Sequence, residues 1–579
     1  MFLEYLLVLV FFFAIGITAN SETSKPNIVV IIADDLGWND LGFHGSNQIP
    51  TPNIDALAYN GIILNRHYVL PTCTPSRAAF ITGKYPIRVG LQGDPGRAQQ
   101  PWTLPLKEKI LPQYLKENGY QTHLVGKWHL GFAKTVLTPT KRGFDSHFGY
   151  FNGWVRYNDS VSSSTPYTGI DARRNLKPAA DEFKNRYATD VFTEEAVNVI
   201  KNQNKETPFF LEFSHVAVHA EKNDIVRARD DEDNNKTFGY IEDLQRRRFA
   251  GALQALDESV GKVMETLNET GLLENSIVLF MADNGGATED PNWLFKNTAS
   301  NWPLRGMKTS FYDGGVRGAA AIWSPLFKRV GHVSNELFHI SDWLPTFVSA
   351  AGGDPSTIEN IDGINQWDIL TGNLIKTERK EVLVNVDFEK NSSAIILDNW
   401  KLIKRNATFR PSFADMYAGV SGRAETPTYD VNAVLTSPTN LLIGQNDSTT
   451  GNRFLQIRDE AKIDSKCRER ISSQPESNVI KCLGNCLYDL EKDPCELTNV
   501  AEQNPTKVKE MESRIAYFES ITEPQQSRVN DPKADPSLWG GYWTPWLDEK
   551  GSSTSSRIAH DLLVFGAMFF IIKKIGSIF

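Results

Sequence analysis

A run of apolar, mostly β-branched residues near the N-terminus is the strongest constraint on how this chain folds. Residues 27–33 read Asn-Ile-Val-Val-Ile-Ile-Ala, without the polar and apolar alternation of a half-exposed strand. Such a run predicts a strand that is buried on both faces in a parallel sheet. Two carboxylates, Asp34 and Asp35, follow it directly. Because ligand groups of open α/β sheets collect beyond the carboxyl ends of the strands, this pair predicts a metal site.

The same arrangement recurs along the first half of the chain. The sequence predicts helices over residues 104–118, 188–202 and 249–270, and short apolar strands over residues 121–125, 208–213 and 276–282. Polar side chains follow the ends of these strands, namely Lys127, His129, His215, His219, Asp283 and Asn284. The pattern indicates a doubly wound α/β domain with one site along an edge of its sheet. Its carboxylate and amide oxygens favour Ca²⁺ or Mg²⁺ over zinc.

Cys73 is the only cysteine in the first 466 residues, and it lies in the stretch Pro-Thr-Cys-Thr-Pro-Ser-Arg over residues 71–77. We expect residues 76–82 to form the first turns of a helix. Free backbone N–H groups at the helix start and the charge of Arg77 would then face Cys73, which suits a nucleophile that handles an anion. The alternative is a buried, inert cysteine in a core.

The other four cysteines crowd into one short segment: Cys467, Cys482, Cys486 and Cys495. A small disulfide framework of an oxidising compartment is the interpretation that fits them. Zinc is disfavoured because the segment contains no C-x-x-C pair and no nearby histidine. Four cysteines allow three pairings, and the sequence leaves these open.

The two ends and the glycosylation patterns indicate the secretory pathway. An apolar run over residues 6–17 is typical of a cleaved secretory signal, here residues 1–19, with an N-terminal membrane anchor as the alternative. Residues 547–579 combine small residues, a polar spacer and a short apolar run, as in a GPI-anchor signal; a membrane-touching tail is the alternative. The N-glycosylation patterns are at Asn158, Asn235, Asn268, Asn391, Asn406 and Asn446. Secretion, the lysosome and the cell surface all remain open.

The pattern of predicted elements changes near residue 381, where short strands replace the alternation of strands and helices. We expect a large domain over residues 25–380 and a smaller α+β domain over residues 381–546, where short strands precede a helix over residues 506–518. Residues 151–174, 289–300 and 408–452 are expected to line the mouth of a pocket. The net charge of −9 and the absence of a Lys/Arg run argue against a nucleic-acid partner.

The stretch Cys73-Thr74-Pro75-Ser76-Arg77, with Thr82 and Gly83, resembles the signature of the type I sulfatases. Further motifs fit that family in order, namely residues 34–35, 126–129, 283–286, 488–490 and 493–494. Within the family, residues 301–308, 314–318 and 339–346 are most similar to the arylsulfatase B (N-acetylgalactosamine-4-sulfatase) branch. The resemblance spans residues 26–546. It implies an alkaline-phosphatase-like large domain, with a mixed, mostly parallel sheet between helices, and a smaller C-terminal domain with an antiparallel sheet.

The resemblance also implies a chemistry. A formylglycine-generating enzyme would oxidise Cys73 to formylglycine during secretion, and one hydroxyl of its hydrate would attack the sulfur of a sulfate ester beside one Ca²⁺ ion. The second hydroxyl would then expel sulfate. By position, the metal ligands are Asp34, Asp35, Asp283, Asn284 and residue 73 itself. Arg77, His129 and Lys127 correspond to catalytic groups, and His219 and Lys308 to sulfate binders, with His215 as the alternative to His219.

The implied substrate is a sulfated sugar of the N-acetylgalactosamine 4-sulfate type, as in dermatan or chondroitin sulfate. A small sulfated metabolite, such as an aryl sulfate or a glucosinolate, is the main alternative, because selectivity depends on loops. A phosphatase or phosphodiesterase of the related fold would want Ser or Thr at position 73 and more metal ligands. A non-catalytic sulfate-binding relative would be expected to lack part of the set of polar residues, and all of them are present.

Overall fold

The computed structural model describes residues 25–223, 225–288, 296–406, 413–415, 427–445, 447–463 and 482–548. The predicted signal peptide, almost all of the predicted tail, Asn446 and Cys467 lie outside these residues. The other five glycosylation candidates have exposed side chains. None of the helices in the described part of the chain is both long and apolar enough to span a membrane.

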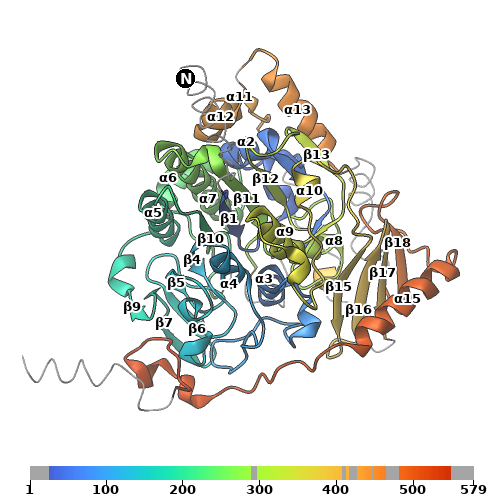
Figure 1. Cartoon of the computed structure of the whole chain (residues 1–579), viewed down its shortest axis with the longest axis horizontal. Helices are drawn as coiled ribbons and strands as arrows, with labels where there is room; N and C mark the ends of the chain where they lie inside the picture. The colour runs from blue at the N-terminus through green and yellow to red at the C-terminus, as the bar shows by residue number, and fades with distance from the viewer. Residues whose placement is uncertain are drawn as a thin grey trace, which may run out of the picture.

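A large mixed sheet forms the centre of the molecule (Figure 1). Within the described residues its strand order is β13-β2-β12-β11-β1-β10-β4-β5-β8-β9. The strands are β1 (Asn27–Ala33), β2 (Ile62–Leu64), β4 (Gln121–Lys127), β5 (Ser146–Tyr150), β8 (Arg173–Arg174), β9 (Lys177–Pro178), β10 (Phe209–Ser214), β11 (Ser276–Ala282), β12 (Ala320–Trp323) and β13 (His332–Ser334). The five neighbours β11, β1, β10, β4 and β5 are parallel, so their carboxyl ends meet at one edge.

Helices cover both faces of this sheet, which explains the continuous apolar run of β1. Its residues Ile28, Val30 and Ile32 pack into one core with residues of α3, α4 and α9, whereas Val29 and Ile31 pack into another with residues of α2, α5 and α7. The helices of the large domain are α2 (Pro52–Asn60), α3 (Cys73–Thr82), α4 (Leu111–Glu117), α5 (Ala188–Lys201), α6 (Asp231–Phe238), α7 (Leu244–Glu269), α8 (Asp313–Val316), α9 (Trp343–Ala350) and α10 (Trp367–Leu370). The predicted alkaline-phosphatase-like layering is confirmed.

Helices α4 and α7 begin several residues away from their predicted starts. Helix α4 begins at Leu111 rather than residue 104, because Pro112 lacks an N–H group and fits only in the first turn of a helix. Helix α7 begins five residues before the predicted start at residue 249, at Leu244. There the Asp243 carboxylate accepts a hydrogen bond from the backbone N–H of Arg246 at 2.7 Å and caps the helix.

The smaller unit is an antiparallel sheet with strand order β15-β16-β17-β18, covered by α15 (Pro505–Ser520). Its strands are β15 (Glu381–Asp387), β16 (Ser392–Leu397), β17 (Trp400–Arg405) and β18 (Asn485–Asp489). Two further pairs lie outside both sheets, β3 (His67–Tyr68) with β14 (Phe338–His339), and β6 (Val161–Ser164) with β7 (Tyr167–Ile170). The predicted antiparallel C-terminal sheet is confirmed.

The predicted smaller domain over residues 381–546 is divided in space. Helices α11 (Val431–Leu435), α12 (Pro438–Ile443) and α13 (Thr450–Ala461) pack on the large domain, because their apolar residues Val434, Phe454 and Ile457 complete the core beside α2. Residues 524–548 also return to the large domain, where Trp543 is fully buried (Figure 1). Residues 427–445, expected at a pocket mouth, therefore cover α2 and α7 instead.

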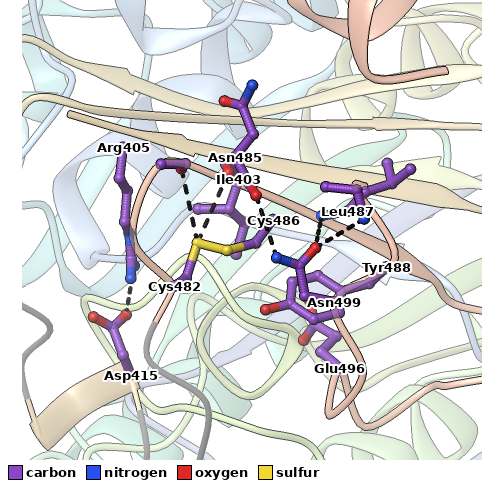
Figure 2. Close-up of a disulfide and its surroundings, with 12 residues drawn as sticks. Ile403, Arg405, Asp415, Cys482, Asn485, Cys486, Leu487, Tyr488, Glu496 and Asn499 are labelled. Carbon is purple, nitrogen blue, oxygen red and sulfur yellow. Dashed lines mark hydrogen bonds and ion pairs between the residues drawn. A yellow bond between two sulfur atoms is a disulfide. The ribbon is translucent and has the colours of Figure 1, made fainter. Parts of the chain in front are cut away.

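The small sheet carries a disulfide between Cys482 and Cys486 (Figure 2). Cys495 is disulfide-bonded as well. Close to Cys495 in the chain, Glu496 forms a buried ion pair with Lys401 of β17 at 2.8 Å, and Lys401 also binds Asp313 of the large domain at 2.8 Å. All three side chains are fully buried, so the two units are joined through compensated charges.

We expect Lys401→Met to destabilise the protein by about 3–5 kcal/mol, because Glu496 would then be buried without its cation and Asp313 would keep only Arg317, at 3.4 Å. The free energy of unfolding from urea denaturation measures this. Lys404→Met on the same strand is the control. Lys404 is 38% exposed and pairs with Glu519, so its loss should cost less than about 1 kcal/mol. Equal losses in the two variants would contradict this account of the interface.

Candidate active site

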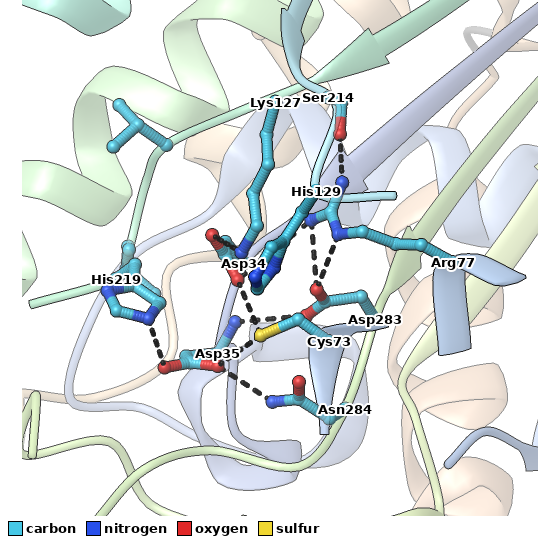
Figure 3. A network of polar contacts seen from close by, with 12 residues as sticks. Asp34, Asp35, Cys73, Arg77, Lys127, His129, Ser214, His219, Asp283 and Asn284 are labelled. Carbon is cyan, nitrogen blue, oxygen red and sulfur yellow. Dashed lines mark hydrogen bonds and ion pairs between the residues drawn. The ribbon is translucent and has the colours of Figure 1, made fainter. Parts of the chain in front are cut away.

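Cys73 begins helix α3 at the carboxyl edge of the large sheet (Figure 3). The helix starts three residues earlier than the sequence predicts, with Pro75 in its first turn, where the missing N–H group costs no hydrogen bond. The thiol is 2% exposed, and its Sγ lies 3.7 Å from Asp34 Oδ1 and 4.0 Å from Asp35 Oδ1. Burial raises the pKa of the Cys73 thiol to about 12.

Three buried carboxylates beside Cys73 each have a buried cation as partner. Lys127 Nζ lies 2.7 Å from Asp34 Oδ2, and Lys308 Nζ lies 2.7 Å from Asp35 Oδ2. Arg77 donates to Asp283 Oδ2 from Nε at 3.1 Å and from a terminal nitrogen at 2.9 Å. The other terminal nitrogen of Arg77 donates to Ser214 Oγ, a contact that sequence reasoning missed.

Burial and the neighbouring charges raise the pKa of Asp34 and lower that of Asp35. For Asp34, burial is the largest influence and raises the pKa, although Lys127 opposes it. For Asp35, burial also acts upward, but Lys308 and His219 outweigh it and lower the pKa. Burial alone would lower the pKa of Lys308, yet the attraction of Asp35 raises it above its ordinary value. Lys308 therefore carries a proton at neutral pH.

Asn284 adds an amide oxygen to the carboxylate oxygens that could bind a cation. Its Nδ2 donates to Asp35 Oδ1 at 2.8 Å, whereas its Oδ1 is buried without a hydrogen-bond partner in the described part of the chain. A buried acceptor without a donor is rare in folded proteins, and such an oxygen is suited to binding an ion or a water molecule. Asp34, Asp35, Cys73 and His219 also bring ligand atoms within 4.8 Å of one another. These donors fit a hard cation at this edge of the sheet.

One ring nitrogen of His129 is hydrogen-bonded, and the other has no hydrogen-bond partner among the described residues. Its Nε2 lies 3.1 Å from the backbone carbonyl oxygen of Gly96, which can only accept, so Nε2 carries the proton. Nδ1 is then the basic nitrogen, buried and without a partner among the described residues. Burial and the charge of Lys127 hold the pKa of His129 well below its usual range, so the ring is neutral and able to accept a proton.

The two histidines after β10 have separate surroundings. His219 Nε2 lies 3.4 Å from Lys308 Nζ and 3.4 Å from Asp35 Oδ2, while its Nδ1 donates to the Ala220 carbonyl oxygen at 2.6 Å. Burial lowers the pKa of His219 to about 3. His215 instead pairs with Ser259 Oγ at 3.0 Å and packs on Phe213. The geometry therefore brings His219, and not His215, to Cys73.

A cavity of about 380 Å³ opens onto Cys73, His129, His219 and Lys308. Of the segments expected at its mouth, residues 151–174 contribute residues 152–154 and 162–165. Residues 94–98 form a further wall that sequence reasoning missed, although the turn-forming Gly93-Asp94-Pro95-Gly96 marks a loop there. Two exposed cations, Arg97 and Lys222, also line the cavity.

Comparison with known proteins agrees with this site. The family described as Sulfatase matches residues 26–353, so the chain belongs to the sulfatase family and is a sulfuric ester hydrolase.

Among individual relatives, the chain is 33% identical to mouse arylsulfatase J over 554 residues, covering 92% of this chain and 82% of that protein. It is 33% identical to human N-acetylgalactosamine-6-sulfatase over 60% of this chain and 66% of that protein. The crystal structure of Ps i-CgsB superposes with a TM-score of 0.65 at 27% identity, covering 89% of this chain and 97% of the other. A second structure of it holds k-i-k-neocarrahexaose.

In folded protein that retains Cys73 as a thiol, we expect no alkylation by iodoacetamide at pH 8. The raised pKa leaves only about one thiol in ten thousand ionised, and the thiolate is the reactive form. Peptide mapping after a short exposure measures this, with urea-unfolded protein as the control. Cys73 is the only free cysteine in the described part of the chain. Rapid labelling of the folded protein would contradict the buried geometry.

Proposed function

We propose that this sulfatase hydrolyses sulfate esters of sulfated sugars of the N-acetylgalactosamine 4-sulfate type, with formylglycine derived from Cys73 and one bound Ca²⁺. One observation carries the proposal: Cys73 starts a helix at the base of a cavity, among Asp34, Asp35 and Asp283 and opposite His129 and Lys308. Positive charge around an attacked sulfuryl group matches the need to stabilise its developing negative charge.

The proposed calcium ligands are Asp34, Asp35, Asp283, Asn284 and the side chain of residue 73. The unpartnered Oδ1 of Asn284 supports this set, because an amide oxygen is a ligand that Ca²⁺ prefers. When bound, Ca²⁺ supplies charge that lowers the pKa of a neighbouring hydroxyl and draws in the sulfate anion. Without it, the three carboxylates and the cations Arg77, Lys127 and Lys308 balance, so the site has no net charge to attract an anion.

In the proposed reaction the hydrate of formylglycine supplies the attacking hydroxyl, and its second hydroxyl allows sulfate to be expelled, which a serine could not do. Nδ1 of His129 is the base for a proton of that hydrate, because it is neutral and unpaired. Arg77 lies one turn after residue 73 on α3 and binds Asp283, and its proposed role is to hold the hydrate. Lys127 opposes the effect of burial on the pKa of Asp34 and so favours the ionised carboxylate.

Lys308 and His219 are the proposed sulfate binders. Since Nδ1 of His219 donates to a backbone carbonyl, Nε2 of the neutral ring has no proton to give. Lys308 is protonated and lies 3.4 Å from that nitrogen. We therefore propose that Lys308 is the source of the proton for the leaving oxygen, directly or through His219.

The substrate proposal rests on the relatives and on charge. One relative is named N-acetylgalactosamine-6-sulfatase, and the sequence motifs resemble the arylsulfatase B branch. The exposed cations Arg97 and Lys222 would attract a polyanionic glycan. A small sulfate ester, aryl sulfate or glucosinolate, is the second candidate. We further propose that a formylglycine-generating enzyme acts on the chain in the secretory pathway. The mature protein would then be secreted, delivered to the lysosome or attached to a membrane by its tail.

We expect Ca²⁺ to stabilise the protein, by about 2.7 kcal/mol at a hundredfold excess over its Kd, and EGTA to remove this. Asp283→Asn should abolish most of the calcium-dependent rise in Tm. Asp257→Asn is the control. Asp257 is a buried carboxylate that caps α2 through the N–H of Ile54 at 2.8 Å, so its loss should lower Tm without changing the calcium response. A larger shift with Mg²⁺ than with Ca²⁺ would contradict the choice of metal.

A substrate panel tests the proposed function. We expect the highest kcat/KM on disaccharides with N-acetylgalactosamine 4-sulfate, compared with the 6-sulfate, 4-nitrophenyl sulfate, a glucosinolate and 4-nitrophenyl phosphate. Faster hydrolysis of the small esters would favour the second candidate.

Cys73→Ser provides the mechanistic control for the panel. It should keep the wild-type Tm and lose turnover on every substrate. Mass spectrometry of the wild-type peptide should find residue 73 about 18 Da below cysteine, unlike the products of ordinary thiol oxidation. An intact thiol in fully active enzyme would refute the formylglycine nucleophile.

A further inference from the structure

One wall of the cavity is held by a segment more than four hundred residues away in sequence. We call residues 89–103 the cavity loop and residues 523–531 the C-terminal strap. The strap pairs with both ends of the loop: Gln92 Nε2 donates to the Glu523 carbonyl at 2.9 Å, and Gln100 Nε2 donates to the Arg528 carbonyl at 2.6 Å. The backbone N–H of Asp531 donates to the Gln99 carbonyl at 2.8 Å.

Gln526 joins the two ends of the loop to each other. Its Nε2 donates to the carbonyl oxygens of Val89 at 3.1 Å and Thr103 at 2.7 Å, and its Oε1 accepts from the N–H of Thr103 at 2.9 Å. Its own backbone N–H donates to the Gly90 carbonyl at 3.1 Å. Both polar atoms of this side chain are thus used to close one loop.

The apex of the same loop contacts His129. The Gly96 carbonyl accepts from His129 Nε2 at 3.1 Å, and the Arg97 carbonyl accepts from Trp102 Nε1 at 2.9 Å. Trp102 precedes the Thr103 that Gln526 binds, and its ring packs edge-on against the His129 ring with centroids 5.7 Å apart. The backbone of Gly153 also lies close to the imidazole. A Cβ atom at this position, which glycine lacks, would lie only 2.7 Å from Cε1 of His129.

We propose that Gln526 is a positioning residue for His129, an inference that rests on the proposed function of that histidine as a base. The Gly96 carbonyl keeps the proton on Nε2 and so leaves Nδ1 basic. Without the Gln526 side chain, Val89 and Thr103 lose their direct link, although Gln92, Gln99 and Gln100 still bind the strap. The Gly96 carbonyl is then held less firmly against Nε2, and the ring can hold its proton on Nδ1 part of the time. In that tautomer Nδ1 cannot accept a proton, although the sulfate binders Lys308 and His219 are untouched.

The neighbouring Gln525 is a matched control. It has the same side chain in the same strap and is likewise partly buried, but its Nε2 has no hydrogen-bond partner in the described part of the chain. Gln525→Ala therefore removes a side chain of equal size without breaking a hydrogen bond to the ends of the cavity loop. Gln526→Ala breaks three.

Three measurements on the full-length protein test the proposal. For Gln526→Ala we expect kcat on the best substrate of the wild type to fall by about tenfold, because part of the contribution of a positioned base is lost. The affinity for inorganic sulfate, by calorimetry, should stay within about threefold of wild type, since the anion site is intact. In protein labelled with ¹⁵N-histidine, His129 should be protonated on Nε2 in the wild type and in Gln525→Ala, and should exchange between the two tautomers in Gln526→Ala. Assignment uses His129→Gln.

The proposal is overturned if His129 keeps its Nε2 proton in Gln526→Ala, or if Gln525→Ala loses as much kcat. Parallel losses of kcat and sulfate affinity would also refute it, because they indicate general collapse of the cavity. The tautomer and sulfate binding are measured without turnover. A wild type that fails to hydrolyse sulfate esters would therefore refute the proposed function, while the tautomer measurement would still test the effect of Gln526 on His129.

Discussion

Charge compensation in a buried site is the constraint on which the rest of this structure depends. Asp34, Asp35 and Asp283 are fully buried, and each is stable there only because Lys127, Lys308 or Arg77 is its direct partner. Removing one member of such a pair leaves an uncompensated buried charge, at a cost of about 3–5 kcal/mol. These six residues lie at strand ends, in a loop and on one helix. The sheet, the helix and the loop must therefore be in register before any of the pairs can form.

The same constraint prepares the site for an anionic substrate. Balanced charges stabilise the folded chain, yet the unpartnered oxygen of Asn284 and the unpaired nitrogen of His129 remain beside Cys73 in the described part of the chain. Both are buried acceptors, one suited to a cation and the other to a proton. The binding of a divalent cation would change the net charge of the site from zero to positive. In a site of this kind, a few atoms without hydrogen-bond partners are left for binding and proton transfer, while the ion pairs stabilise the fold.

Much of the fold could be predicted from the sequence where local patterns were strong. Strands β1 and β11 begin and end at the predicted residues, because apolar runs without alternation are recognisable at both ends. Helix α4 is shorter than predicted because the apolar periodicity extends to the N-terminal side of Pro112, where the backbone does not continue the helix. The cavity loop, Ser214 and the strap were missed. Their role comes from backbone carbonyls and from contacts across hundreds of residues, such as Gln526 with Thr103, and these leave no periodic signal.

By itself the sequence determined the parallel sheet, the polar strand ends and the unusual position of Cys73, since burial and alternation are properties of neighbouring residues. Only the tertiary structure decided between His215 and His219, because both follow β10 and their partners, Ser259 for His215 and Lys308 for His219, come from distant parts of the sequence. It also decided that residues 427–445 and 447–463 belong to the large domain, where they cover an apolar face of α2. Such outcomes depend on which surfaces meet in space, and no local pattern records that.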